Sequence, residues 1–158
     1  MPLLPPADIL VQLFVVSFFL NLLWENHHST LYKTCYDWPY EKVMRLLTMM
    51  SLKDAFWISL FYTGTVLLFQ NVAILENLPQ LTFFVFLALA FSFTDEKVSV
   101  RMRRWEYLPS MPTVFGVGLT PLIELATTGV AAFLVVFLYL SRSRSFLKKF
   151  LQKKIYRS

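Results

Sequence analysis

The chain has 158 residues, of which 56% are hydrophobic and 16% are charged, and its mean hydropathy is +0.54. A soluble domain carries about 25% charged residues, so the composition excludes an ordinary soluble protein and indicates an integral membrane protein. The net charge is +5, and seven of the 15 Lys and Arg residues follow Leu140. A basic segment beside an apolar span suits an anionic lipid surface better than a nucleic acid.

Four segments are long and apolar enough to cross a bilayer, which takes about 20 residues. They are Ile9–Trp24, with its helix continuing to Tyr32, then Ala55–Leu75, Leu78–Phe93 extended by one or two polar turns, and Pro121–Leu140. Backbone groups in lipid must be hydrogen-bonded internally, so these spans are helices. The sequence predicts an all-α four-helix transmembrane domain over residues 1–140. A basic amphipathic tail over residues 141–158 then lies in the membrane interface or anchors the topology.

The connections between the spans differ in length. The second and third spans are joined by a tight link, "ENLPQ". Residues 37–55 combine a capping Asp37, Pro39 and an apolar stripe, which favours an interfacial helix between the first two spans. The last connection is rich in charge, then in aromatic residues, then in Pro and Gly.

This topology gathers the polar residues at one end of the bundle, which we call side A. The first span ends there, the second begins there, the third ends there and the fourth begins there. The ionisable and aromatic residues expected on side A are Glu25, His27, His28, Asp54, Glu96, Arg101, Arg103, Arg104, Trp105, Tyr107 and Glu124. Both termini then lie on the opposite side B. Lys and Arg number eight on side A and seven on side B, and we place both termini in the cytoplasm because the side-B charges are dense and unpaired, whereas those on side A alternate with acids.

The first span carries a polar stripe with helical spacing: Ser17, Asn21, Glu25, His28 and Tyr32. Such a stripe within a membrane is expected to point into the bundle. Glu25 and His28 also form the Glu-x-x-His spacing that supplies metal ligands in carboxylate bundles. A second copy is absent from the sequence, so we assign no metal ligand. A single metal with Asp54 or Glu96 stays open beside the simpler reading of an interfacial His hydrogen-bonded to a loop.

Three further acids complete the candidate site. Asp54 is expected in the first turn of the second span, where it either complements the helix dipole or joins the site. Glu96 and Glu124 lie in apolar surroundings. Glu124 requires a partner, and Arg101, Arg103 or Arg104 are expected to reach it. Glu124 is then either a proton donor or half of a structural ion pair.

The pattern "NLLWE…LY", together with Asp54 and the stretch from Glu96 through "WEY", "MP" and "GVGLTPL", resembles a family of small bacterial four-helix membrane proteins. The resemblance covers most of the chain and implies the fold alone. This chain has Met49 where the family pattern has His and Glu124 where it has Gln.

The shorter stretch from "WEY" to "PLIE" is also similar to the membrane lycopene cyclase domains of carotenoid synthesis. This likeness implies that Glu124 protonates an alkene and that Trp105 and Tyr107 shield a carbocation by cation–π contact. The implied class is a cyclase- or isomerase-like membrane enzyme.

These observations leave three functions open. In the first, the protein binds or converts an isoprenoid or other lipid: Glu124, Glu25, Asp54 and Glu96 are the catalytic candidates, and the ligand-binding candidates are Asn21, His28, Tyr32, Arg101, Arg104, Trp105 and Tyr107. In the second, it is an accessory subunit that packs against a membrane protein partner or a second copy of itself. In the third, it is a small proton-coupled transporter.

Overall fold

The computed structural model describes residues 3–155, and it describes side chains as far as residue 139. This part of the chain forms five α-helices, two 3₁₀ helices and one short β-hairpin. The elements are α1 (Ala7–His28), η1 (Ser29–Leu31), α2 (Lys33–Asp37), α3 (Tyr40–Phe69), η2 (Ile74–Glu76), α4 (Leu78–Arg101), β1 (Thr113–Val114), β2 (Val117–Gly118) and α5 (Leu119–Ile155).

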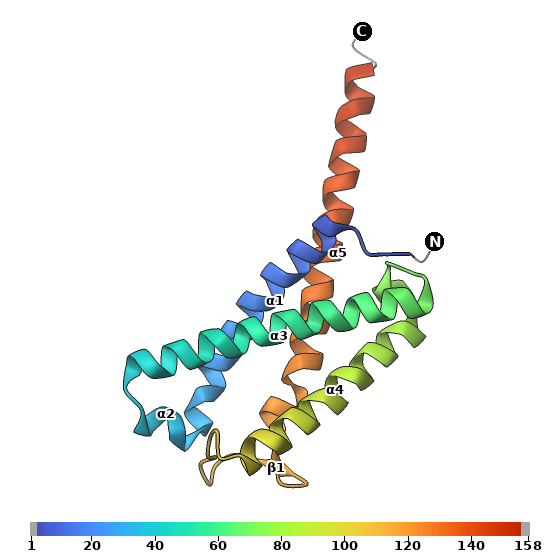
Figure 1. The fold of residues 1–158 in the computed structure, drawn as a ribbon. Coiled ribbons are helices and arrows are strands. Elements are labelled where there is room, and N and C mark those ends of the chain that lie inside the picture. Colours follow the sequence, from blue (N-terminus) through green and yellow to red (C-terminus); the bar gives the residue numbers. More distant parts are fainter. Residues whose placement is uncertain (1–2, 156–158) are drawn as a thin grey trace.

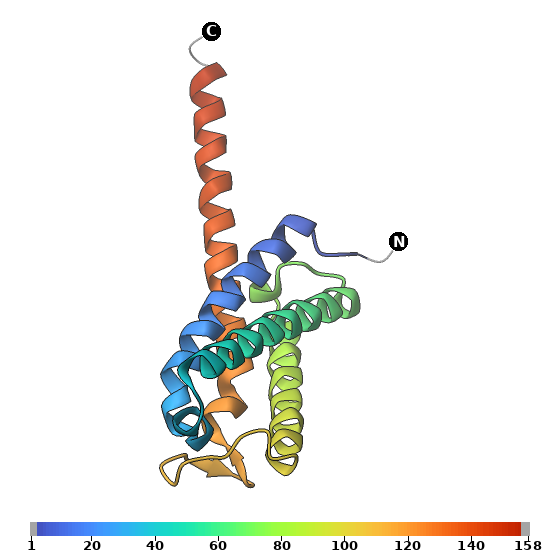
Figure 2. The ribbon, with the colours of Figure 1, turned by 60° about the vertical axis from the view of Figure 1, so that its left-hand side comes forward.

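Helices α1, α3, α4 and α5 are each long and apolar enough to cross a membrane (Figure 1). The predicted all-α four-helix membrane bundle is therefore confirmed. Helix α1 packs against α3 and α5, and α4 packs against α5. Helix α2 and the β-hairpin lie together at one end of the bundle, which corresponds to side A (Figure 2).

The predicted interfacial helix over residues 37–55 is wrong as a separate element. Helix α3 runs without interruption from Tyr40 to Phe69, so these residues form the first half of the second span. Pro39 stands at the N-cap position, and no Gly or Pro interrupts the chain from Tyr40 to Thr63. With no breaker and a continuous apolar face, one long helix results. Asp54 consequently lies near the middle of α3.

The other helix ends follow the sequence more closely. Helix α4 continues to Arg101, which confirms the predicted polar extension of the third span. Its start is capped by the Asn77 side chain, whose Oδ1 accepts from the Gln80 N–H at 3.2 Å. Helix α5 continues to Ile155 and so passes through the predicted boundary at residue 140. The predicted interfacial position of the tail over residues 141–158 depends on side chains that lie outside those the structure describes.

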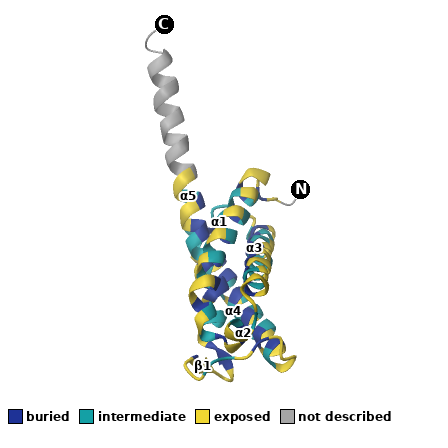
Figure 3. Ribbon diagram, turned by 90° about the vertical axis from the view of Figure 1, so that its left-hand side faces the viewer, coloured by how far each residue is buried: buried dark blue, intermediate teal, exposed yellow. Residues whose placement is uncertain are grey.

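An apolar layer fills the middle of the bundle and separates its two ends. The buried residues of the spanning helices are dark blue in Figure 3. The layer contains Leu13, Ile58, Tyr62, Phe84, Ala88 and Phe133, all fully buried. The ring of Phe84 lies so close to Gly129 that a Cβ there would come within 2.6 Å of its Cζ. Gly129 thus permits the tight approach of α4 to α5.

A neutral polar group lies beyond this layer, on side B. We call Thr65, Asn71 and Gln80 the amide cluster. Gln80 is fully buried, and its Nε2 donates to the Asn71 carbonyl oxygen at 2.9 Å and to Thr65 Oγ1 at 3.3 Å. Gln80 Oε1 accepts from Asn71 Nδ2 at 3.2 Å. These bonds fix the link between α3 and α4.

Candidate functional site: a carboxyl site at one end of the bundle

Each of the four spanning helices contributes a buried or half-buried carboxyl group to a single cavity on side A. The groups are Glu25 from α1, Asp54 from α3, Glu96 from α4 and Glu124 from α5. Helix α4 adds a second one, Asp95, which is paired with Lys53. The cavity has a volume of about 60 Å³, and His28, Tyr32 and Trp105 also line it. We call the four carboxyl groups and His28 the carboxyl site. The predicted convergence of Glu25, His28, Asp54, Glu96, Glu124, Tyr32 and Trp105 is therefore observed.

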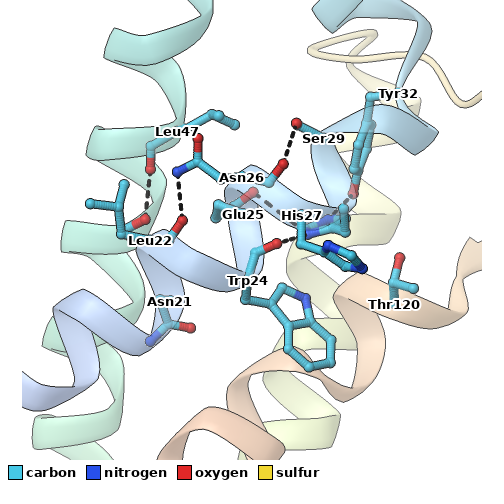
Figure 4. A network of polar contacts seen from close by, with 12 residues as sticks. Asn21, Leu22, Trp24, Glu25, Asn26, His27, Ser29, Tyr32, Leu47 and Thr120 are labelled. Atoms are coloured by element: carbon cyan, nitrogen blue, oxygen red, sulfur yellow. Dashed lines mark hydrogen bonds and ion pairs between the residues drawn. The ribbon is translucent and has the colours of Figure 1, made fainter.

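The polar stripe of α1 faces the interior of the bundle, as expected. Ser17, Asn21, Glu25 and His28 are buried, whereas the neighbouring His27 is exposed. Figure 4 shows Asn21 and Glu25 along this helix, with Tyr32 beyond its end. Asn21 Oδ1 accepts from Thr128 Oγ1 at 2.9 Å, which joins α1 to α5 one turn below the carboxyl groups. Asn21 does not line the cavity, and its contacts are those of a positioning residue.

Glu96 is held by three hydrogen bonds to one oxygen. Its Oε1 accepts from Tyr107 Oη at 2.5 Å, from Trp105 Nε1 at 3.0 Å and from Tyr32 Oη at 3.3 Å. Charge-assisted bonds of this kind are the stronger ones in proteins. Tyr107 Oη in turn accepts from the Gly118 N–H at 3.0 Å. Glu96 therefore organises the loop between α4 and α5.

A short antiparallel pairing closes the site on its outer side. Tyr32 pairs with Tyr107 as an isolated β-bridge. The Lys33 N–H donates to the Glu106 carbonyl oxygen, and the Leu108 N–H donates to the Leu31 carbonyl oxygen, both at 2.9 Å. The segment after α1 and the loop before α5 thus form one cover. This cover brings the Tyr32 and Trp105 side chains over the cavity.

The two glycines before α5 have distinct structural roles. Gly116 has φ +76° and follows Phe115 at φ +52°, so the two form the tight turn of the β-hairpin. A Cβ at Gly118 would meet the Pro121 ring at 3.0 Å and Met111 Sδ at 3.2 Å. Small residues are therefore needed here to seat the loop against the start of α5.

Asp54 is half-buried and reaches the cavity from the middle of α3. Next to it, Lys53 Nζ forms an ion pair with Asp95 Oδ2 at 2.6 Å, which links α3 to α4 at the rim of the site. Sequence reasoning missed this pair. The i, i+1 neighbours Lys53–Asp54 and Asp95–Glu96 gave no sign of it, because the pairing depends on how the two helices are oriented about their axes.

The expectation that an arginine pairs with Glu124 is wrong. Arg101, Arg103 and Arg104 are exposed, and no ion pair joins them to Glu124 in the part of the chain that is described. Helix α4 ends at Arg101, and the following backbone turns outward through Arg103 at φ +54°. Arg101 and Arg104 do not line the cavity, and their predicted role in ligand binding has no support from their position.

Glu124 carries a buried oxygen without a hydrogen bond. Glu124 is 5% exposed, and no group bonds to its Oε1 within the described residues. It lies close enough to Glu25, Asp54 and Glu96 for their charges to interact. An unpartnered buried polar group costs about 1–3 kcal/mol of stability. No Lys or Arg lines the cavity among the described residues, and Lys53, which is paired with Asp95 at the rim, offsets this concentration of acids only in part.

Burial and nearby acids raise the pKa of the two tyrosines of the cover. Burial raises the pKa of Tyr107 well above its usual range, and its hydrogen bond to Glu96 acts in the same direction. Burial also raises the pKa of Tyr32, and the charges of Glu96 and Glu25 add to this effect. Both hydroxyl groups therefore remain protonated, and remain donors, across the ordinary pH range.

Comparisons with protein-family models, with curated proteins and with solved structures found no match for this chain.

Proposed function

We propose that the protein binds the polar or reacting end of an isoprenoid or another lipid in the carboxyl site and converts it by proton transfer. The observation that carries this proposal is the composition of the cavity. Carboxyl groups from all four spanning helices meet an apolar wall made of Leu46, Leu47, Met50, Phe91 and Leu125. A site of mixed polarity inside a membrane bundle fits an amphiphile that arrives from the bilayer.

The volume and charge of the cavity limit the kinds of ligand that it can bind. About 60 Å³ holds a few water molecules or one small group, since one water needs about 10–15 Å³. The site thus takes only the end of a lipid, and the chain lies along the apolar wall and the bilayer. Because acids surround the cavity, an uncharged or cationic end fits it better than a phosphate does.

Asp54 and Glu124 are the two carboxyl groups best placed for proton transfer. Glu96 is held by three donors, and Glu25 Oε2 lies against His28 Nδ1 at 3.9 Å. In an isomerisation or cyclisation, one carboxylic acid gives its proton to a double bond, and the resulting carbocation then loses a proton to a carboxylate. Trp105 lines the cavity and can stabilise that cation through its ring. Tyr107 does not line the cavity, because its hydroxyl group is directed to Glu96.

Mass spectrometry of lipids that co-purify with the protein in mild detergent tests this proposal. We expect one defined isoprenoid or lipid to co-purify with the wild type. Asp54→Asn should co-purify with the unconverted precursor of that compound, and Glu25→Ala should retain less of either compound. Glu41→Gln, an exposed acid in the first turn of α3, is the matched control. Bulk membrane lipid alone in every sample, with a recurring protein partner, would instead support the accessory-subunit function.

The apolar layer makes the transporter function less favourable. A proton path across the membrane would have to pass Leu13, Phe84 and Phe133, which are fully buried.

We further propose that both termini are cytoplasmic. A reporter fused to the C-terminus that fluoresces only in the cytoplasm is expected to be active, and a periplasmic phosphatase fusion is expected to be inactive.

A further inference from the structure

Three side chains of the carboxyl site have the spacing of metal ligands. Glu25 and His28 lie one turn apart on α1, and Glu124 reaches them from α5. One ligand atom from each residue lies within 4.8 Å of the other two. All three residues are buried, with exposed fractions of 7%, 5% and 5%. Acidic groups often cluster without an ion, so the spacing needs independent support.

That support comes from the oxygen of Glu124 that has no partner. Glu124 lines the cavity, its Oε1 is fully buried, and no described donor bonds to it. A buried carboxyl group that stays ionised is paired, hydrogen-bonded or bound to a metal. Neither a Lys nor an Arg lines the cavity within the described residues. A cation between Glu124, Glu25 and His28 would satisfy this oxygen.

We propose that Glu25, His28 and Glu124 bind one divalent first-row transition-metal ion. An imidazole together with two carboxylates favours Mn²⁺, Fe²⁺ or Zn²⁺ over Mg²⁺ and Ca²⁺, which prefer oxygen ligands alone. Ligands about 2.1 Å from one ion lie about 3.4 Å apart when they are tetrahedral. Atoms that lie as far as 4.8 Å from one another therefore need to close by up to about 1.4 Å around the ion. The remaining cavity has room for water or a lipid end at the open positions.

The scaffold around the three ligands is already fixed. The bond from Thr128 Oγ1 to Asn21 Oδ1 joins α1 and α5 four residues from Glu25 and from Glu124. His28 Nδ1 lies 3.3 Å from the Trp24 carbonyl oxygen, and its Nε2 lies 3.4 Å from Tyr32 Oη. When one of these ring nitrogens binds the ion, the contact of the other remains, and such outer contacts orient ligands and contribute to metal affinity.

This inference rests on the proposed function only in sharing its cavity. With the ion in place, Glu124 is a ligand, so Asp54 is left as the group that transfers protons. The ion would also present a positive charge to the end of the lipid. Metal binding can be measured without any lipid, and the two proposals can therefore fail separately.

The test uses the full chain in detergent after treatment with a chelator. Mn²⁺ or Zn²⁺ is added, the excess is removed, and bound metal is counted by elemental mass spectrometry. We expect about one ion per chain for the wild type and for His27→Ala, whose side chain is exposed on the adjacent position. We expect at least a tenfold loss of affinity for His28→Ala and Glu124→Gln, as the loss of a ligand requires. Equal binding by the two histidine variants would overturn the proposal.

A second measurement does not depend on whether a variant folds. Co²⁺ added to the wild type is expected to give a visible absorption band that Zn²⁺ displaces at one equivalent. Absence of the band and of stoichiometric Mn²⁺ or Zn²⁺ would overturn the site. If metal binds while the lipid experiment shows only bulk lipid, the ion site stands and the lipid function fails. If Asp54→Asn retains metal and loses conversion, both proposals stand.

Discussion

The amide cluster and the carboxyl site are both polar groups buried at the ends of one membrane bundle, yet they differ in how their hydrogen bonds are satisfied. Gln80, Asn71 and Thr65 are neutral and bond to one another and to backbone carbonyl groups. The carboxyl site concentrates acids and leaves Glu124 Oε1 without a partner. The difference teaches that polarity in a membrane bundle is not itself a sign of function. Several acidic groups beside one cavity, with a buried oxygen that lacks a hydrogen bond, are the feature that indicates a functional site.

The largest effect on stability is expected from Gln80→Leu. The change removes the bonds of Gln80 to the Asn71 side chain, to the Asn71 carbonyl oxygen and to Thr65 Oγ1, which costs about 2–4 kcal/mol. Thermal unfolding in detergent measures this loss. Gln12→Leu, at a half-buried position of α1 outside the cluster, is the control. Ligand binding per folded molecule should not change, and its loss would remove the distinction between the two clusters.

Glu124→Leu is expected to increase the stability of the protein, whereas Gln80→Leu decreases it. Removing an unpartnered buried carboxyl group should raise the metal-free stability by about 1–3 kcal/mol, while lipid conversion and metal binding are lost. Unfolding in the presence of a chelator measures the stability. A decrease comparable with that of Gln80→Leu would show that Glu124 is a structural residue.

An intermediate effect is expected for Tyr107→Phe. The variant loses the 2.5 Å donor to Glu96 and the acceptor for the Gly118 N–H, at a cost of about 1–2 kcal/mol. The pH dependence gives a sharper test. Because folding raises the pKa of Tyr107, its contribution is complete below its ordinary value of 10.0 and is lost as the pH rises beyond it. The wild type should lose more stability than Tyr107→Phe between pH 9 and 11. If stability falls equally with pH in both proteins, Tyr107 does not have a raised pKa in the folded state.

The smallest effect is expected for Lys33→Ala. Lys33 Nζ lies 3.2 Å from Glu106 Oε2, but both side chains are more than half exposed, and solvent screens such pairs. The backbone bonds between the same segments should keep the cover closed. The midpoint of thermal unfolding should shift by no more than the error of measurement. Trp105→Ala, in the same cover, should lower that midpoint clearly. A large effect of Lys33→Ala would place the stability of the cover in its side-chain charges.

Hydropathy alone was sufficient to predict that there are four spans and at which end of the bundle the polar groups meet, although not the bounds of the second span. A continuous apolar run with helical spacing has one low-energy solution in lipid. Because successive spans cross in opposite directions, Glu25, Glu96 and Glu124 then share one end. The buried stripe from Ser17 to His28 follows from helical periodicity in the same way.

Contacts between distant segments were beyond such reasoning. The length of α3 was missed because Asp37 and Pro39 suggested a separate helix, whereas the residues after Pro39 contain no break. The arginine partner of Glu124 was expected from proximity along the chain, but the turn after Arg101 directs those side chains outward. The three donors to Glu96 require the pairing of Tyr32 with Tyr107, and no local pattern encodes that pairing.

The cover joins residues next to α1 with residues next to α5, and this bears on how the protein is made. Membrane helices enter the bilayer in chain order, so Glu25 and His28 are inserted long before Glu124 and Tyr107 have been synthesised. Until the last span arrives, the first span presents its acid and imidazole to water at the membrane surface or to the translocation machinery. The cavity, the cover and any ion that binds there thus come into existence together, as the final event in assembly.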